Sequence, residues 1–448
     1  MSIKPILTTL LTTMALIVSL TSRAQSPAHT MIHVDDVMSN IYPGMTYSYD
    51  LYVPQQYNGS EEACLYVGLD GVLCHAPEVM DSLIEAGRMP VTIGVFLQPG
   101  VIKNQQGEVL RYNRSNQFDA TDATFARYLA TEVLPSVTSQ TLSDGRKIRL
   151  SPRGSDHMIF GLSSGGIAAF TAAWHRPDLF GRVFSGVGTF VAMRGGNDLQ
   201  AIIRKSEPRP LRVFLQDGTN DVWNPIFGHW YEGNQSLASA LKFAGYDVDA
   251  DWSDGGHNVL RSSEIFPQVM QWMWRDWPEP LQPRATSNEL LAPLLIHGEQ
   301  WQPTVPPAQL PKQRWVAYPD STFVVMTHEG SNYLWQYMLT PEGLLTHGQR
   351  FYWLHSYDNS VLTIGPMSFD ANGNLWVVTN AGIQICDQNG RVRGIITLPW
   401  QIDVGEIIGM EIIDGQVTLS LSNGTALGRR FNVTAPTPGV RPKSQGQG

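Results

Sequence analysis

From about residue 45 to residue 277, short apolar runs alternate with longer stretches that have helical periodicity. Residues 64–67 and 91–96 are continuously apolar, as expected for parallel strands that are buried on both faces. Residues 76–88, between them, have the spacing of a helix. Because a helix that connects two parallel strands is the repeating unit of an α/β fold, this alternation predicts a doubly wound, mostly parallel sheet with helices on both faces.

The rest of this region follows the same pattern. Residues 47–53 alternate polar and apolar side chains and end at Pro54, which favours a half-buried antiparallel strand. Further strands are predicted at 157–160, 212–215 and 248–252, and further helices at 122–133, where Pro135 ends the helix, at 165–175 and at 265–277.

The sequence changes in character after residue 277. Eight prolines fall between residues 278 and 311 without any periodicity, which predicts an interdomain linker or an irregular wrap. Strand-like runs and Asn-Gly turns then predict an all-β region, whose spacing suits propeller blades or a sandwich. A length of 448 residues suits two domains. The predicted organisation is a signal peptide at 1–24, an α/β domain at 25–282, a proline-rich linker at 283–312, an all-β domain at 313–433 and a disordered tail at 434–448.

The N-terminus predicts export. Lys4 precedes an apolar stretch at 6–20, and Ser22-Arg23-Ala24 places small residues at the two positions that a signal peptidase reads. An N-terminal membrane anchor is the alternative, but the apolar run is short for a span. No later stretch is long and apolar enough to cross a membrane. We therefore expect a periplasmic or secreted protein that has no membrane association once the signal peptide is removed.

Charge and cysteine content exclude several classes of protein. The net charge of −9 argues against a nucleic-acid-binding protein, which needs a basic face. Three cysteines, Cys64, Cys74 and Cys386, are too few for a disulfide scaffold or a multi-cysteine zinc module. Whether Cys64 and Cys74 pair in an oxidising compartment stays open, and Cys386 is expected to be a buried apolar residue.

The strongest local motif is Gly161-Leu162-Ser163-Ser164-Gly165-Gly166, at the point where a predicted strand turns into a helix. A G-x-S-x-G sequence in that context is typical of a nucleophile elbow. Gly161 and Gly165 lack the Cβ atoms that would clash where strand and helix approach each other. Ser163 then lies at a helix N-terminus, where backbone N–H groups stabilise a developing oxyanion. The alternative is a glycine-rich turn with incidental serines.

A nucleophilic serine needs a base that is oriented by a carboxylate. His257 follows the strand at 248–252 and two glycines, so we expect it at the carboxyl edge of the sheet and choose it as the base. His157 and His175 suit structural roles. For the acid, Asp221 is preferred to Asp217, although an ordinary turn aspartate is the alternative for either.

Other residues complete the predicted site. The loop 69–72 follows an early strand, so the backbone N–H of Val72 would form an oxyanion hole with that of Ser164, unless the loop is a simple turn. Trp223 and Trp230 are expected to form a platform for a sugar ring or an aromatic acyl group. The alternative is a packed cap over the edge of the sheet. His229, in the same segment, would face the substrate. Arg114 is expected to form a surface salt bridge in preference to contacting an anionic substrate.

These segments resemble, in order and spacing, the esterase D and enterochelin esterase superfamily of α/β hydrolases, over residues 40–280. That superfamily includes family 1 carbohydrate esterases and mycolyltransferases. In the similar feruloyl esterases, the aspartate that closes a Gly-Thr-Asn-Asp run is the triad acid, which supports Asp221. The resemblance implies an α/β-hydrolase fold and acyl hydrolysis or transfer without a metal or organic cofactor. The matching segments are Leu69-Asp70-Gly71, Gly161 to Gly166, Gly218-Thr219-Asn220-Asp221 and Gly255-Gly256-His257.

The C-terminal region resembles the gluconolactonase-like propellers at residues 367–379 and 382–387. Its length suffices for roughly three blades of ~40 residues, and a closed propeller needs more. Gly365-Pro366 stands where that family places a metal-ligating residue. We therefore expect a degenerate accessory or carbohydrate-facing module in this region.

Together these observations predict an exported serine ester hydrolase with the triad Ser163, His257 and Asp221. The predicted substrate is an acetyl or feruloyl ester of a polysaccharide or oligosaccharide. Two alternatives remain: a sugar lactonase that uses the C-terminal region and a divalent metal, and a non-catalytic glycan-binding protein.

Overall fold

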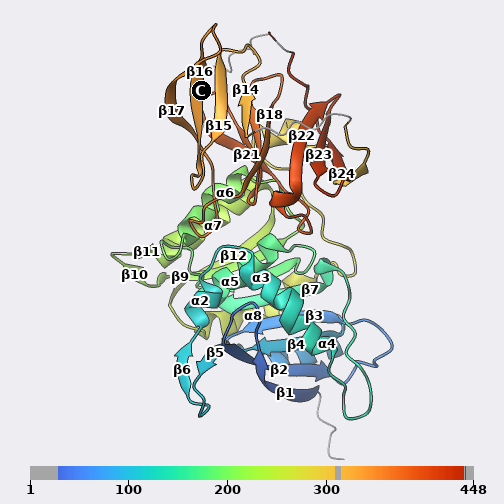
Figure 1. Ribbon diagram of the computed structural model, residues 1–448. Coiled ribbons are helices and arrows are strands. Elements are labelled where there is room, and N and C mark those ends of the chain that lie inside the picture. The colour runs from blue at the N-terminus through green and yellow to red at the C-terminus, as the bar shows by residue number, and fades with distance from the viewer. Residues whose placement is uncertain (1–28, 308–313, 438, 440–448) are drawn as a thin grey trace, which may run out of the picture.

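The structure is a computed structural model that describes residues 29–307, 314–437 and 439. It contains an α/β region built on one ten-stranded sheet and an all-β region of three four-stranded sheets (Figure 1). The predicted signal peptide and most of the predicted tail lie outside the described residues. The mixed α/β class with a separate all-β C-terminal region is confirmed.

The large sheet is parallel over six neighbouring strands and antiparallel at one side. Strand β4 pairs with β2, which also pairs with β1 and β5, and β6 extends the sheet from β5. The antiparallel strand predicted at 47–53 is therefore present as part of β2. The parallel strands, in spatial order, are β12 (Asp247–Gly256), β9 (Arg212–Asn220), β8 (Arg182–Gly186), β7 (His157–Leu162), β3 (Cys64–Leu69) and β4 (Thr92–Leu97), and the antiparallel strands are β1 (His29–Met38), β2 (Met45–Pro54), β5 (Val101–Lys103) and β6 (Val109–Tyr112).

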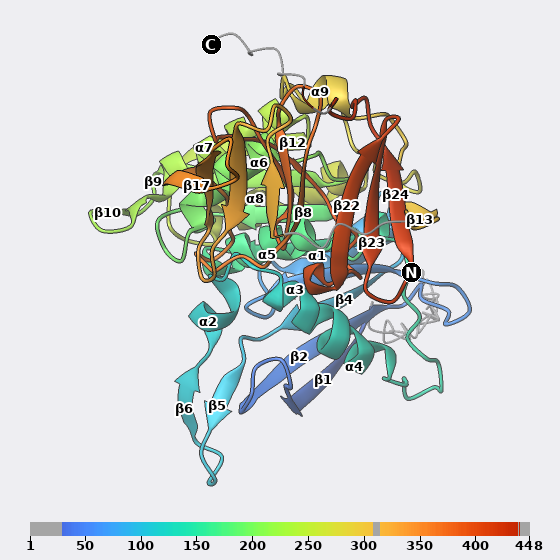
Figure 2. The same ribbon diagram turned by 45° about the horizontal axis from the view of Figure 1, so that its top comes forward.

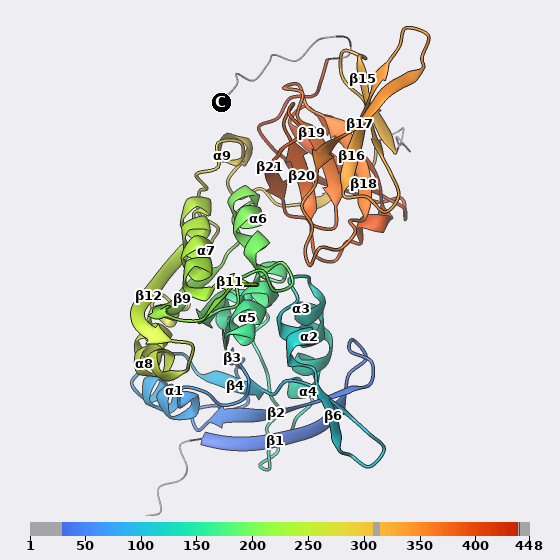
Figure 3. The same cartoon turned by 90° about the vertical axis from the view of Figure 1, so that its left-hand side faces the viewer.

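Helices cover both faces of this sheet (Figure 3). Successive side chains of a strand point to opposite faces, so Leu65 and Val67 pack in one core and Tyr66 packs in the other. The face with Tyr66 is covered by α1 (Ala76–Glu85) and α8 (Leu260–Trp274), and the opposite face by α3 (Thr124–Tyr128), α5 (Ser164–His175), α6 (Leu199–Lys205) and α7 (Trp230–Ala244). The hairpin formed by β5 and β6 extends away from the sheet and leads into α2 (Arg114–Phe118) (Figure 2).

The helix that was predicted to end at Pro135 continues to Thr138, so its predicted end is wrong. After α3 the chain forms a π-helical turn, Leu129–Val133, and then α4, Leu134–Thr138. Pro135 lies inside this continuous helical run, where its missing backbone N–H removes one helical hydrogen bond, and the π-helical turn lies just before it. A proline signal therefore marks a change in helical pitch here instead of a terminus.

Each sheet of the all-β region is antiparallel. Three four-stranded sheets agree in number with the three blades expected from length, while the propeller arrangement itself stays a prediction. In spatial order the sheets are β14 (Trp315–Ala317), β15 (Phe323–Thr327), β16 (Tyr333–Leu339) and β17 (Leu345–Trp353); β18 (Ile364–Phe369), β19 (Leu375–Thr379), β20 (Gly382–Cys386) and β21 (Val392–Ile396); and β13 (Gln302–Thr304), β24 (Ala426–Arg430), β23 (Gln416–Leu421) and β22 (Ile407–Ile413).

The described part of the predicted linker contains regular structure. It contains α9 (Leu291–Leu294), whose two leucines are buried among apolar residues of the all-β region, and the edge strand β13. The side chain of Asn288 donates to the carbonyl oxygens of Arg204 at 3.0 Å and Arg393 at 2.9 Å, one in each region. This segment therefore connects the two regions by packing against both.

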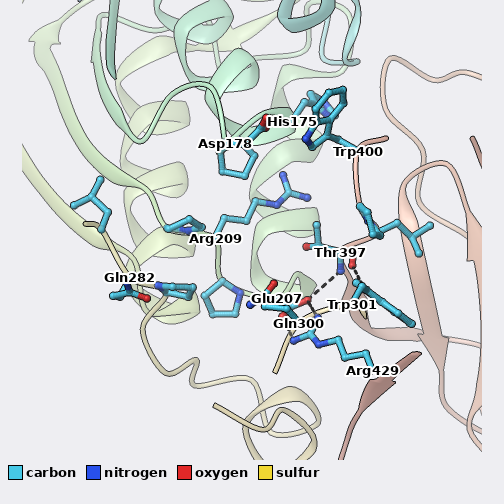
Figure 4. A pocket seen from close by; sticks show the side chains of 17 residues that line it. His175, Asp178, Glu207, Arg209, Gln282, Gln300, Trp301, Thr397, Trp400 and Arg429 are labelled. Carbon is cyan, nitrogen blue, oxygen red and sulfur yellow. Dashed lines mark hydrogen bonds and ion pairs between the residues drawn. The ribbon is translucent and has the colours of Figure 1, made fainter. Parts of the chain in front are cut away.

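A cavity of about 460 Å³ lies between the two regions (Figure 4). In its wall Arg429, from β24, donates to both carboxylate oxygens of Glu207 at 3.0 and 2.5 Å. Glu207 also accepts from the backbone N–H of Thr397 at 3.1 Å. Because the side chains of Arg429 and Glu207 are only 5% and 13% exposed, loss of one partner leaves the other charge buried.

We expect Arg429→Ala to lower the thermal unfolding midpoint clearly, because breaking a buried ion pair on one side costs about 3–5 kcal/mol. The matched control is Glu264→Ala, which removes an exposed partner of Arg261 and should change stability by no more than about 0.5 kcal/mol. Differential scanning calorimetry compares the two variants with the wild type. Equal midpoints for all three proteins would contradict this account of the interface.

The three cysteines are buried and unbonded, so Cys64 and Cys74 do not form a disulfide in this structure. The expected burial of Cys386 is confirmed.

Two described residues of the predicted tail form backbone hydrogen bonds with the all-β region. The carbonyl oxygen of Thr434 accepts from the N–H of Ala371, and the N–H of Gly439 donates to the carbonyl oxygen of Pro319. Among the described residues, no helix has the length and apolar character needed to cross a membrane.

Candidate active site

Ser163 lies in the turn between β7 and α5, in the strand–turn–helix context that the motif predicts. Its backbone has φ 57° and ψ −121°, a strained conformation for a residue with a Cβ. A Cβ on Gly161 would lie 2.3 Å from the carbonyl oxygen of Gly165, and one on Gly166 would lie 2.7 Å from Ser185 Oγ. The Cβ on Gly161 would meet backbone atoms, so glycine is required there, as predicted. At Gly165, the second glycine predicted to permit the close approach, a Cβ would meet only Asp70 Oδ2 at 3.1 Å and Leu69 Cβ at 3.6 Å, so the tighter contact falls on Gly166 instead.

The structure brings Ser163, His257 and Asp221 together in one row of hydrogen bonds. His257 Nε2 is 2.8 Å from Ser163 Oγ, and His257 Nδ1 is 2.6 Å from Asp221 Oδ1. Asp221 directly follows β9 and His257 directly follows β12, so both lie at the carboxyl edge of the parallel strands. This arrangement has the geometry in which a histidine takes a proton from a serine while a carboxylate holds the imidazole.

Asp217 is close to this row but does not bind the histidine. Its carboxyl group is fully buried and accepts from the backbone N–H of Gly218 and from Asn234 Nδ2, both at 2.7 Å. Burial, followed by the hydrogen bond and negative charge of Asp221, raises the pKa of Asp217 well above the ordinary aspartate value. Asp217 is therefore protonated at neutral pH.

Asp221 has the opposite protonation behaviour. Burial acts to raise the pKa of this carboxyl group, but hydrogen bonds from His257, Asp217 and the backbone N–H of Val222 lower it below its ordinary value. Its Oδ1 contacts His257 while its Oδ2 is buried. The pair thus contains one ionised carboxylate, which faces the histidine, and one neutral acid behind it.

The two predicted oxyanion donors have free backbone N–H groups. Within the described ranges, no hydrogen bond engages the N–H of Val72 or that of Ser164, which is the first residue of α5. The N–H of Gly71, one residue before Val72, instead donates to Leu97 O at 3.1 Å. Both Asp70 and Gly71 have positive φ values, 66° and 81°, which turn this loop sharply after β3.

The predicted substrate-contact residues have different environments. Trp223 and His229 face each other across a short hairpin of β10 (Trp223–Asn224) and β11 (Gly228–His229), directly after Asp221. Trp223 is 66% exposed, and His229 is half-buried. Trp230 is buried, packs edge-on against His257 and donates to Thr189 Oγ1 at 3.3 Å. Trp230 therefore forms the wall behind the histidine, while Trp223 is open to a ligand.

Two polar residues of the site, Thr189 and Asn234, were not predicted from the sequence. Thr189 Oγ1 is 3.4 Å from Ser163 Oγ, and the Thr189 N–H donates to Ser163 O. Asn234, on α7, donates to Asp217 and to Gly188 O. Thr189 follows β8, a strand not predicted, and its position after a parallel strand is the signal that could have found it. Asn234 is four residues after Trp230 on a helix and gives no such signal.

Over residues 29–307, 314–437 and 439, no group of three or more His, Cys, Asp or Glu side chains is arranged to hold a metal ion.

Comparison with known proteins identifies similar sequences and folds. A family model described as "Putative esterase" matches residues 42–278. The enterobactin esterase of Shigella flexneri, solved with 2,3-dihydroxy-N-benzoyl-glycine, is 22% identical with a TM-score of 0.43, and the match covers 56% of this chain and 61% of that one. A ferulic acid esterase is 18% identical with a TM-score of 0.41, covering 55% and 98%. The feruloyl esterase module of Clostridium thermocellum in complex with sinapinate is 13% identical with a TM-score of 0.40, covering 56% and 90%. No curated protein matches the sequence. The match to the enterobactin esterase covers less than two thirds of the length of that protein.

Proposed function

The chain belongs to this esterase family, and on that premise we propose that the carboxylic ester hydrolase uses Ser163, His257 and Asp221 as its catalytic triad. The observation that carries the proposal is the continuous row of hydrogen bonds, 2.8 Å from Ser163 to His257 and 2.6 Å from His257 to Asp221.

In the proposed mechanism, Ser163 Oγ attacks the ester carbonyl carbon while His257 Nε2 accepts the hydroxyl proton. His257 then donates this proton to the leaving alcohol, and a water molecule repeats the sequence on the acyl-enzyme. Asp221 stabilises the imidazolium and fixes its tautomer through Nδ1. The N–H groups of Val72 and Ser164 bind the oxyanion, and each such donor contributes about 3–4 kcal/mol.

The proposed substrate is an acetyl or feruloyl ester of a polysaccharide or oligosaccharide. Support comes from apolar side chains that are exposed close in sequence to the site residues: Trp223 and Ile226 on the hairpin after Asp221, Leu260 after His257, and Val72. An exposed aromatic ring beside an ester-cleaving site suits a sugar ring or an aromatic acyl group. Export, proposed from the N-terminal sequence, would bring the enzyme to such a substrate.

The two alternatives receive less support. Membership of the esterase family makes the chain an enzyme, which removes the non-catalytic glycan-binding protein as the description of the whole chain. A lactonase in the all-β region needs a divalent metal, and the described residues of that region hold no cluster suited to one. The all-β region is therefore proposed as an accessory module.

A fluorophosphonate probe tests the proposed nucleophile. The probe reacts with an activated serine, so we expect one modification per chain, on the peptide that contains Ser163, with complete loss of p-nitrophenyl acetate hydrolysis. Peptide mass spectrometry locates the modification. A panel of methyl ferulate, acetylated xylan and p-nitrophenyl acetate then ranks acyl groups by kcat/KM. Modification at another serine, or full activity after modification of Ser163, would reject the triad.

A further inference from the structure

Arg114 connects the two loops that carry the proposed oxyanion donors. Its Nε and Nη2 atoms donate to Oδ1 and Oδ2 of Asp70 at 2.7 and 2.8 Å, and Nη2 also donates to the carbonyl oxygen of Leu162 at 3.2 Å. Asp70 is two residues before Val72, and Leu162 directly precedes Ser163. One guanidinium group therefore binds the loop after β3 and the turn after β7.

The backbone that carries Arg114 is itself fixed by hydrogen bonds. The N–H of Asn113 donates to Gly100 O at 2.8 Å, and Gln117 Oε1 accepts from the N–H of Gly100 at 2.7 Å. Asn113 and Gln117 are buried, and the Arg114 guanidinium lies 5.6 Å from the ring centre of buried Phe118. Arg114 thus reaches the site from a rigid support, so its planar donor group can impose a position on the two loops.

Both loops need such support because their backbones are strained. Asp70 and Ser163 have φ values of 66° and 57°, in the left-handed region that disfavours a residue with a side chain. The Asp70 carboxylate lies against the start of α5, since a Cβ on Gly165 would be 3.1 Å from Asp70 Oδ2. The negative charge of Asp70 is therefore adjacent to the residues that would bind the oxyanion.

We infer that Arg114 is a positioning residue for the oxyanion hole, in which it fixes the Val72 loop against the Ser163 turn and neutralises the Asp70 carboxylate beside the developing negative charge. The inference rests on the proposed esterase mechanism. Without Arg114, Asp70 would repel the oxyanion, and the two donor N–H groups would lose their fixed separation.

Arg114→Gln tests the inference by steady-state kinetics with p-nitrophenyl acetate. Removal of one oxyanion donor typically costs 10²–10³-fold, so we expect kcat to fall by about 30–300-fold with KM changed by no more than about threefold. Binding of a trifluoromethyl ketone, which forms an oxyanion adduct with the serine, should weaken by a similar factor. Adding Asp70→Asn removes the uncompensated charge, so the double variant should recover about 5–10-fold of the lost kcat.

Arg176→Gln is the matched control, because Arg176 forms the same two-point ion pair with Asp178 at the C-terminal end of α5, away from Ser163. We expect this variant to retain wild-type kcat and inhibitor affinity. Circular dichroism checks folding, and Arg114→Lys, which keeps the charge without the two-point geometry, serves if Arg114→Gln is unfolded.

Three results would overturn the inference. Wild-type kcat in the folded Arg114 variants would do so, as would unchanged affinity for the trifluoromethyl ketone. A double variant no more active than Arg114→Gln would also do so, since a role in folding alone predicts additive damage. If the wild type hydrolysed no ester, the proposed function itself would fail. If the wild type is active and the Arg114 variants keep its kcat, only the inference about Arg114 fails.

Discussion

Ser163→Ala is expected to lower kcat/KM for p-nitrophenyl acetate by roughly 10⁶-fold, the scale seen when a triad nucleophile is removed. The alanine has no oxygen to attack the carbonyl, and the remaining oxyanion donors can assist only direct attack by water. KM should change little, because the substitution removes an atom that reacts and leaves the surrounding surface intact. Stopped and continuous spectrophotometric assays at high enzyme concentration measure the residual rate.

The control for this variant is Ser239→Ala, the same substitution on the exposed face of α7, where the hydroxyl accepts a hydrogen bond from Arg204. It should retain wild-type activity. Hydrolysis by Ser163→Ala at even one hundredth of the wild-type rate would place the chemistry elsewhere in the chain.

Asp221→Asn is expected to lower kcat by about 10³–10⁴-fold, whereas Asp217→Asn should stay within about fivefold of the wild type. The amide at position 221 cannot stabilise the imidazolium and favours the wrong tautomer of His257. At position 217 the same substitution replaces a carboxyl group that burial and Asp221 already keep neutral. Each variant replaces one of two neighbouring carboxyl groups, of which only Asp221 contacts His257, so each controls for the other. Equal losses of kcat would contradict the assignment of Asp221.

The raised pKa of Asp217 also predicts how the stability of the folded protein depends on pH. Since the pKa of Asp217 is raised on folding, the folded protein binds more protons than the unfolded chain above the ordinary aspartate value of 3.8. The contribution of Asp217 therefore falls as pH increases from about 4 toward its raised pKa. Asp217→Asn should reduce this slope in urea unfolding measurements at pH 5, 6.5 and 8. An unchanged slope in the variant would mean that Asp217 is ionised in both the folded and the unfolded protein over this pH range.

The predictable part of the site depends on local patterns. The motif around Ser163 specifies its own turn, because Gly161 lets strand β7 and helix α5 approach each other without a Cβ clash. Asp221 and His257 could be predicted to lie near Ser163 because parallel strands bring their carboxyl ends to one edge of a sheet. Loops that are distant in sequence are then placed together once the strands are identified. In each case a short segment carries most of the information.

The residues that could not be predicted depend on long-range packing. Arg114 was expected to form a surface salt bridge, and it does form an ion pair, but its partner Asp70 is 44 residues away and its third contact, Leu162, is 48 residues away. Nothing near Arg114 indicates that the β5–β6 hairpin returns the chain to the site. The number of prolines in 283–312 likewise conceals α9 and β13, because their burial depends on the all-β region that follows.

The pairing of β13 with β24 has a mechanical consequence. The chain leaves the α/β region, contributes β13 to the edge of the last sheet, and only then forms the other sheets. If the chain is pulled from the α/β region, the tension therefore reaches the pairing of residues 302–304 with residues 426–428 before it reaches most of the all-β fold. This short ladder, together with the packing of α9, would therefore resist separation of the all-β region from the α/β region.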